Sequence, residues 1–368
     1  MSAFEFTLAT KADDASLRER MSHDAMEGTI DVSFRREPCY FAGAGVQGET
    51  IQIIKCVDKK KQCIAGIGAR MTSDVYINGL RQRMGYLSDL RAAPDYRKST
   101  LLARGYRYLR QLHQADPVPL YTTVILDGNQ QALDNLTDAR AGLPRYQNKG
   151  RILTPAIHLD FKHKPFKLSG VEIQLADKQS LNEVFEFVQK QYAKKQFAPY
   201  YQASDLEGAR LKGLRPEDIY VARKNQKIVG VVAAWDQRAF RQTHIEGYNG
   251  GLKLIRPFYN MIAKFTPLKA LPDKGKAVPY FYLALTAIKG DNPDVFKALL
   301  SKLYDDKRNG EWHYFIAGLH ERSPLQTVLS EFRSIKAAGH LFIVHYPDES
   351  AFFNQLDARI PHIEMGAI

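Results

Sequence analysis

The chain has 368 residues, more than one hydrophobic core usually holds, so two domains are expected. With 45% hydrophobic and 25% charged residues it has an ordinary globular composition, and no apolar run approaches the roughly 20 residues that a membrane span needs. The first residues lack a basic-then-apolar signal pattern, and the three cysteines have no metal spacing. These features favour a cytoplasmic protein without a metal site.

The formal net charge of +12 would suit nucleic acid, a membrane surface or a phosphorylated ligand. A helix is predicted at residues 14–26, and strands at residues 50–57 and 63–73. The densest basic cluster, Lys59–Lys61, lies between these strands and is typical of a solvated hairpin turn. No zinc-finger spacing or RNA-binding strand motif accompanies it, so no nucleic-acid partner is expected.

Residues 86–112 form the most informative segment, with a short strand, a turn at Pro94, a basic corner and an amphipathic helix. The buried side of this helix is predicted at i, i+4, i+7 and i+11: Leu102, Tyr106, Leu109 and His113. Ser99 and Thr100 are natural N-caps, and two cations directly precede them. A helix start offers unpaired N–H groups and partial positive charge, so the corner could hold a phosphate. An ordinary capped surface helix with solvated cations is the alternative.

A strand at residues 120–126 follows, and two motifs around it carry a resemblance to a known family. Residues 90–97, LRAAPDYR, resemble the "L-x-V-x-P-x-Y-R" signature of the GCN5-related N-acetyltransferases, the GNAT family. In that family the signature forms the fourth strand and the turn into the acetyl-CoA-binding helix. Residues 127–132, DGNQQA, resemble its "N-x-x-A" opening of the next helix. The resemblance covers roughly residues 5–158.

The resemblance implies a coenzyme A site with acetyl-CoA as the donor. The fourth and fifth strands would splay apart, and the pantetheine arm would lie between them like an added strand. The backbone N–H of Leu90 would face the acetyl oxygen. Backbone groups of Ala92, next to Arg91, would hold the pantetheine arm, and Asn129 would contact it from the far side.

The pyrophosphate would lie over the loop and the first helical turn, at Arg97, Lys98, Ser99, Thr100, Leu101 and Leu102. Thr100 and Leu102 stand where the family has glycines, which allow a close backbone approach to a ligand. The predicted cradle therefore depends on backbone N–H groups and on side-chain donors.

Two residues are candidates for proton transfer. Asp89 is the carboxylate of the predicted fourth strand and could serve as general base, directly or through water. An ion-paired carboxylate, for example with Arg91, is the alternative. The family often places a tyrosine acid in the helix after "N-x-x-A", but residues 133–137 contain none. Tyr146 is the nearest substitute, and a core or loop tyrosine is the alternative.

Residues 159–170 are rich in lysine and show no periodicity, as expected of a linker. The second half then repeats the pattern of the first, with a strand, a helix, a hairpin, another strand and another helix. The expected elements lie at residues 171–175, 180–192, 218–223, 227–235, 280–288 and 295–304. Asp291 and Asp294 stand near the start of the last helix and would repel a phosphate.

We therefore predict an α/β (α+β) protein of two tandem GNAT folds, each a mixed, mostly antiparallel sheet flanked by helices. Residues 1–158 would form the domain that binds coenzyme A, residues 159–170 the linker, and residues 171–368 a degenerate copy that shapes the acceptor pocket. Residues 247–280 mix aromatic, aliphatic and basic residues with three prolines. They are expected to pack on their own domain or to cover a cleft, and a membrane or acyl-chain contact is the alternative.

The predicted function is acetyl-CoA-dependent N-acetyltransfer to an amine of a small molecule or peptide, in a ternary complex. A non-catalytic acyl-CoA-binding or regulatory protein is the alternative. Two His-x-Glu pairs, at residues 244–246 and 362–364, lack a third ligand fixed by sequence, so no metal is expected.

Overall fold

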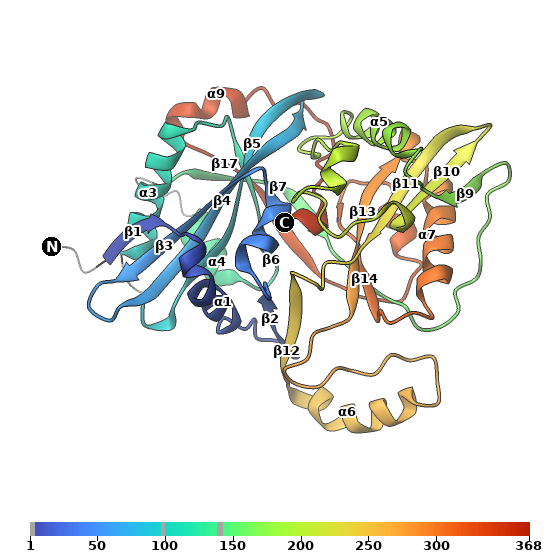
Figure 1. Cartoon of the computed structure of the whole chain (residues 1–368), viewed down its shortest axis with the longest axis horizontal. Coiled ribbons are helices and arrows are strands. Elements are labelled where there is room, and N and C mark those ends of the chain that lie inside the picture. The colour runs from blue at the N-terminus through green and yellow to red at the C-terminus, as the bar shows by residue number, and fades with distance from the viewer. Residues whose placement is uncertain (1–3, 97–99, 138–142) are drawn as a thin grey trace.

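Two mixed sheets form the body of the protein (Figure 1). The computed structural model describes residues 4–96, 100–137 and 143–368. The first sheet contains, in spatial order, β1 (Phe4–Leu8), β3 (Thr50–Asp58), β4 (Cys63–Ile77), β5 (Leu80–Ala92), β6 (Tyr121–Leu126), β17 (Ala338–His345), β7 (Arg145–Leu153) and β15 (Leu319–His320). The second contains β16 (Ser334–Ile335), β8 (Ala156–His158), β14 (Tyr314–Ile316), β13 (Tyr280–Ile288), β11 (Lys227–Trp235), β10 (Ile219–Lys224) and β9 (Glu172–Leu175).

Neighbouring strands in both sheets are antiparallel except for two pairs. β5 is parallel to β6, and β13 is parallel to β14. A separate ribbon joins β2 (Ile30–Arg35) to β12 (Gln242–Tyr248), and so ties the two halves of the chain together. The predicted fold class of mixed, mostly antiparallel sheets is confirmed.

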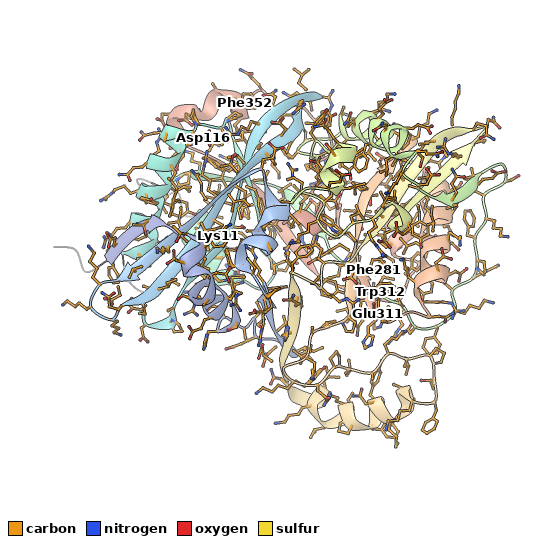
Figure 2. All side chains as sticks on the ribbon, in the orientation of Figure 1. Lys11, Asp116, Phe281, Glu311, Trp312 and Phe352 are labelled. Atoms are coloured by element: carbon orange, nitrogen blue, oxygen red, sulfur yellow. The ribbon has the colours of Figure 1, made fainter. Side chains whose placement is uncertain are left out.

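Each sheet is covered by a helix on both faces. Alternate residues of a strand point to opposite faces, and in β3 Ile53 packs with α1 (Asp14–Ser22) while Ile54 packs with α3 (Leu101–Ala115). In the second sheet, α5 (Leu181–Tyr192) and α7 (Pro293–Lys307) lie on opposite faces in the same way. Figure 2 labels Phe281 and Trp312 beside α7, where their ring centroids lie 5.5 Å apart. The short helices are α2 (Tyr40–Ala44), α4 (Gln130–Thr137), α8 (Gln326–Leu329) and α9 (Ser350–Phe353).

The central strands of the two sheets repeat the same two irregularities. β5 pairs with β6 only as far as Tyr86, and β13 pairs with β14 only as far as Tyr282. Three residues later each strand has a β-bulge with a positive φ, 53° at Asp89 and 50° at Leu285. Because both features recur at the same spacing, Asp89 corresponds to Leu285, and the two halves are copies of one fold.

The two halves also complete each other's sheet. β17, from the second half of the chain, lies between β6 and β7 and pairs with both. β8, which follows β7, takes the corresponding position between β14 and β16. The predicted linker, residues 159–170, contains no helix or strand, but a cut there would remove an inner strand from each sheet. Residues 1–158 and 171–368 are therefore interlocked.

The insertion at residues 247–280 departs from the expectation that it packs on its own domain. It forms the end of β12 and then α6 (Gly250–Ala263), a helix without a buried residue. In Figure 1, α6 lies apart from both sheets. None of the helices among the described residues combines the length and apolar character that a bilayer crossing requires.

The strand exchange predicts that neither half folds by itself. A chain that ends at residue 170 would leave β6 and β7 without β17 and would expose the edges of both strands. We expect residues 1–170 alone to aggregate or to stay partly unfolded, and co-expression with residues 171–368 to restore a complex. Far-UV circular dichroism and gel filtration of each piece, alone and together, measure this. Cooperative folding of residues 1–170 alone would contradict the prediction.

Candidate functional site

An opening between β5 and β6 forms the centre of the candidate site. The two strands pair at Gly85–Tyr121 and Tyr86–Thr122, and within the described strands they have no further pairing with each other. β6 remains paired to β17 on its other side along its whole length, and β5 remains paired to β4. The splayed fourth and fifth strands expected from sequence are therefore present, and a ligand could add main-chain-like contacts between them.

A β-bulge shapes the β5 wall of this opening. Ile67 of β4 is opposite Arg91 and Ala69 is opposite Ser88, so Gly68 alone faces the two residues Asp89 and Leu90. Bulges re-aim groups next to active sites and often carry backbone strain, here a φ of 53° at Asp89. The Leu90 side chain is 52% exposed, which fits an open position beside the bulge.

Asp89 lies in a buried ion pair. Its Oδ2 is 2.6 Å from Nη2 of Arg36 and accepts a hydrogen bond of 2.7 Å from the Tyr40 hydroxyl. Burial raises the pKa of Asp89, but the charges of Arg36, Arg91 and Arg241 and the bond from Tyr40 outweigh it and leave the pKa below its usual value. Asp89 is therefore ionised at neutral pH, and a carboxylate with a lowered pKa is a weak base. The geometry favours the ion-paired alternative, with Arg36 as the partner.

The second half of the chain contributes a wall to the same region. Arg241 precedes β12 and donates to the main-chain oxygens of Gly366, at 2.8 Å, and of Ile368. Its charge acts on both Asp89 and Tyr86, and the pKa of the Tyr86 hydroxyl is raised by burial and by Asp89. The sequence carried no local signal for Arg36, Tyr40 or Arg241, because each reaches the site from a separate element.

The two residues after Leu90 point to different partners. The Arg91 guanidinium donates to the main-chain oxygen of Asp24 at 3.3 Å and lies 4.0 Å from its carboxylate. Its Nε is buried without a hydrogen-bond partner among the described residues. Ala92 pairs with Gly66 in the β4–β5 ladder. The Arg91 side chain therefore braces β5 against the segment after α1.

At the predicted phosphate end, Arg97, Lys98 and Ser99 lie outside the described residues. Thr100 is exposed and caps α3, where its main-chain oxygen accepts from the Arg104 N–H. The side chains of Leu101 and Leu102 face the core, Leu101 with Cys56 and Leu102 with Tyr106. A Cβ on Gly66 would lie 2.9 Å from Leu101, so this glycine lets the start of α3 approach the sheet. Any contact of Leu101 or Leu102 with phosphate must therefore use the main chain.

Asn129 and Tyr146 both have structural partners. Asn129 precedes α4, and its Oδ1 accepts the Ala132 N–H at 3.1 Å, an N-cap bond. Tyr146 lies on β7, and its hydroxyl contacts that of Tyr106 on α3. Burial and the Tyr106 neighbour raise the pKa of Tyr146 well above its usual value. The phenol therefore stays protonated at neutral pH, as an acid must, but β17 lies between Tyr146 and the opening.

The equivalent opening in the second copy is filled by the last residues of the chain. The Glu364 carboxylate accepts the Leu285 N–H at 3.0 Å and the Tyr192 hydroxyl at 3.1 Å. A Cβ on Gly318, just beyond β14, would lie 1.8 Å from Met365, so this segment packs tightly between the strands. The second copy therefore has no room for a pantetheine arm. Asp89 occupies the bulge position in the first copy that Leu285 occupies in the second.

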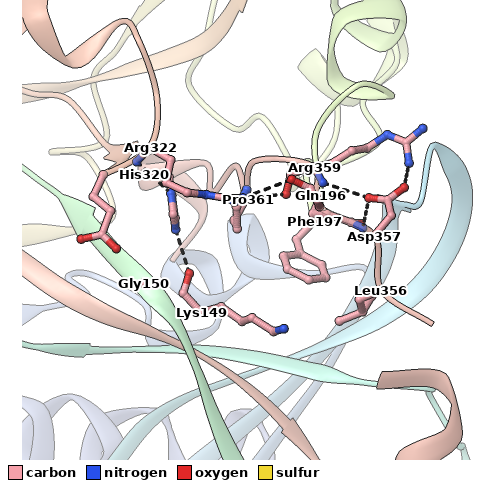
Figure 3. Close-up of a pocket in the computed structure, with 12 residues that line it drawn as sticks. Lys149, Gly150, Gln196, Phe197, His320, Arg322, Leu356, Asp357, Arg359 and Pro361 are labelled. Atoms are coloured by element: carbon pink, nitrogen blue, oxygen red, sulfur yellow. Dashed lines mark hydrogen bonds and ion pairs between the residues drawn. The ribbon is translucent and has the colours of Figure 1, made fainter. Parts of the chain in front are cut away.

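A separate cavity of about 360 Å³ lies where the two sheets meet (Figure 3). His320 of β15 contacts the main-chain oxygen of Lys149 at 2.8 Å, and Gln196 donates to Asp357 at 2.8 Å across the rim. None of the predicted site residues lines this cavity. Among the described residues, no group of three His, Cys, Asp or Glu side chains is placed to hold a metal ion.

Solved structures share this arrangement. N-myristoyltransferase of Saccharomyces cerevisiae with bound myristoyl-CoA aligns with a TM-score of 0.61 at 12% identity, over 94% of this chain and 80% of that one. A GCN5-related N-acetyltransferase of Sphaerobacter thermophilus aligns with a TM-score of 0.54 at 10% identity, over 100% and 99% of the two chains. This chain has the GNAT fold, in two tandem copies. At these identities the likeness is one of fold. No family model matches the sequence, and a search of curated proteins finds no match.

The Asp89–Arg36 pair gives a prediction about stability. Asp89→Asn would leave the Arg36 guanidinium, which is 3% exposed, without a counter-ion. Breaking a buried pair in this way costs about 3–5 kcal/mol. Urea unfolding should show that loss, whereas Asp74→Asn, whose partner Arg81 is half exposed, should cost less than about 1 kcal/mol. Equal and small losses would show that the buried pair does not stabilise the fold.

Glu364 gives a prediction about pH. Burial raises the pKa of Glu364 from 4.5 to about 7. The folded protein therefore holds an additional proton at Glu364 between these values, so the contribution of Glu364 to the free energy of unfolding should fall as pH rises through this window. The shift corresponds to on the order of 3 kcal/mol.

Glu364→Gln keeps the acceptor oxygen and is neutral at every pH, so it should lose this decline. Urea unfolding from pH 4 to pH 8 measures it, with the exposed Glu321→Gln as control. The same decline in all three proteins would show that Glu364 is not its source.

Proposed function

We propose that this chain is an acyl-CoA-dependent N-acyltransferase. It would bind its donor in the β5–β6 opening of the first copy and transfer the acyl group directly to an amine in a ternary complex. The observation that carries the proposal is the opening itself, with a bulge at Asp89–Leu90, in a fold shared with an N-myristoyltransferase solved with myristoyl-CoA. The second copy, whose opening is filled by Glu364, would serve to shape the acceptor side.

The strand geometry supplies the binding chemistry. A pantetheine arm has amide groups and can pair with β5 where β6 has diverged. The main-chain N–H of Asp89 or Leu90, turned out of the ladder at the bulge, would donate to the thioester oxygen and stabilise the oxyanion of the transition state. The pyrophosphate would lie at the start of α3, where main-chain donors and the helix dipole favour an anion. Arg97, Lys98, Ser99 and Thr100 would add side-chain donors there.

Proton transfer would use the two candidates expected from the sequence. Asp89, ionised and held by Arg36, would accept the amine proton through water, and Tyr146 would serve as the acid for the thiolate by way of Tyr106. Because the pKa of Asp89 is lowered, much of the rate should come from amine that is already neutral. The rate should therefore rise with pH up to the pKa of the acceptor amine.

The donor is proposed to be acetyl-CoA, as the signature at residues 90–97 implies, and the acceptor a small molecule or a peptide. A non-catalytic acyl-CoA-binding or regulatory protein is the second candidate. Two observations favour it: Asp89 and Tyr146 are engaged by protein partners, and Leu102, at a position where the family has glycine, packs in the core.

Thermal unfolding with ligands tests the binding site. Acetyl-CoA at a hundred times its Kd should stabilise the folded state by about 2.7 kcal/mol, whereas DNA and RNA should give no shift. Arg97→Ala should weaken acetyl-CoA binding about tenfold through lost phosphate contact. Arg107→Ala, an exposed arginine further along α3, is the matched control and should bind as the parent does.

The release of the coenzyme A thiol from acetyl-CoA, measured with a panel of amines, then distinguishes an enzyme from a non-catalytic binding protein. Binding without release at any pH would favour the non-catalytic candidate. Comparing the thiol release from acetyl-CoA and from myristoyl-CoA shows whether the enzyme prefers a short or a long acyl chain. If neither thioester raises the melting temperature, the proposed function fails.

A further inference from the structure

α6 carries an apolar face that no part of the described chain covers. None of its 14 residues is buried, and the helix stands at the end of the β2–β12 ribbon, away from both sheets (Figure 1). Four large apolar side chains recur at i, i+4, i+7 and i+11, a spacing that places them on one face. They are Leu254, Phe258 and Met261 of α6 and Phe265, in the turn directly after it, and their exposed fractions are 80%, 62%, 51% and 85%.

The opposite face of α6 is held by the chain that returns from it. Arg256 forms an ion pair of 2.5 Å with Asp273. Asn260 exchanges two hydrogen bonds with the main chain of Leu271, at 3.0 and 2.8 Å. These contacts hold α6 by its polar face, and the apolar face is therefore exposed to solvent. A contiguous exposed apolar patch of this kind marks an interaction site.

The surroundings of this face are strongly cationic. Residues 250–278 contain six Lys or Arg residues and one Asp, a net charge of +5 out of +12 for the whole chain. α6 itself has no acidic residue. Lys253 and Lys264 are exposed and lie together along one edge of the apolar face on the helical wheel, about a quarter turn from its centre.

We propose that α6 docks on the surface of an anionic lipid bilayer. The four apolar side chains would enter the boundary between headgroups and acyl chains, with the helix axis in the plane of the membrane. Lys253 and Lys264 would lie at the level of the lipid phosphates. A second copy of this chain is a poorer occupant, because pairing the two faces would bring the lysines of both copies together. This docking is independent of the acyl transfer proposed above.

Vesicle binding tests the proposal with the full chain. We expect co-sedimentation with vesicles of phosphatidylcholine and phosphatidylglycerol, little with phosphatidylcholine alone, and release by high salt. Phe258→Ser with Phe265→Ser should weaken binding about tenfold or more, because each buried aromatic ring contributes apolar area. Lys253→Glu with Lys264→Glu should have a similar effect. In Phe258→Trp, tryptophan emission should shift to the blue on anionic vesicles.

Matched controls use equally exposed residues elsewhere. Leu80→Ser, at a side chain 66% exposed on the β4–β5 hairpin, should leave binding unchanged. Lys178→Glu with Lys289→Glu makes the same charge change away from α6 and should do little. Equal losses in the α6 and control variants would overturn the proposal. So would the absence of binding to anionic vesicles, or a stable dimer that the Phe258 and Phe265 changes dissociate.

Discussion

The exchange of β17 and β8 fixes the relative position of everything else in this protein. Each strand lies inside the sheet of the other half and is paired on both sides, so each sheet needs a strand from the other half to complete its hydrogen bonds. The chain crosses between the two sheets four times, from β7 to β8, from β14 to β15, from β15 to β16 and from β16 to β17. The region around Asp89 draws residues from both halves. Its geometry is therefore set by the same main-chain pairing that holds the sheets, rather than by a surface contact between two domains.

The repeated bulge shows how one backbone feature can have two outcomes. A main-chain N–H that is turned out of a ladder needs another partner, because an unpaired buried donor is costly. In the second copy the Leu285 N–H meets the Glu364 carboxylate, which comes from a segment 79 residues away. In the first copy Asp89 holds the equivalent bulge position, on the part of β5 that lies beyond its last pairing with β6 at Tyr86–Thr122. The same strand geometry therefore closes one copy and leaves the other available for a ligand.

Much of the fold could be predicted from local sequence patterns. The features that were not predicted depend on contacts between residues far apart in the sequence. The order of elements follows from periodicity and the duplication from the similar strand patterns of the two halves. The splay of the fourth and fifth strands was implied by the resemblance at residues 90–97, and its position at Tyr86 comes from the structure. The strand exchange could not be predicted, because β17 looks like any buried strand and its partners lie about 200 residues away. The partner of Asp89 was missed for the same reason: Arg36 and Tyr40 reach it from an irregular segment and from α2. The insertion that holds α6 was expected to pack on its own domain or to cover a cleft because its three prolines argue against one long interfacial helix, but Pro257 lies inside α6.

Two enclosed carboxylates show how neighbouring charges set the chemistry of each copy. Asp89 and Glu364 are both enclosed and both accept hydrogen bonds from a tyrosine, Tyr40 in one case and Tyr192 in the other. Burial raises the pKa of each, and only Asp89 has a guanidinium within hydrogen-bond distance. The Arg36 charge therefore keeps Asp89 ionised, while Glu364 titrates near pH 7. The first copy thus holds a fixed negative charge beside its opening, whereas the group that fills the second opening is partly neutral under the same conditions.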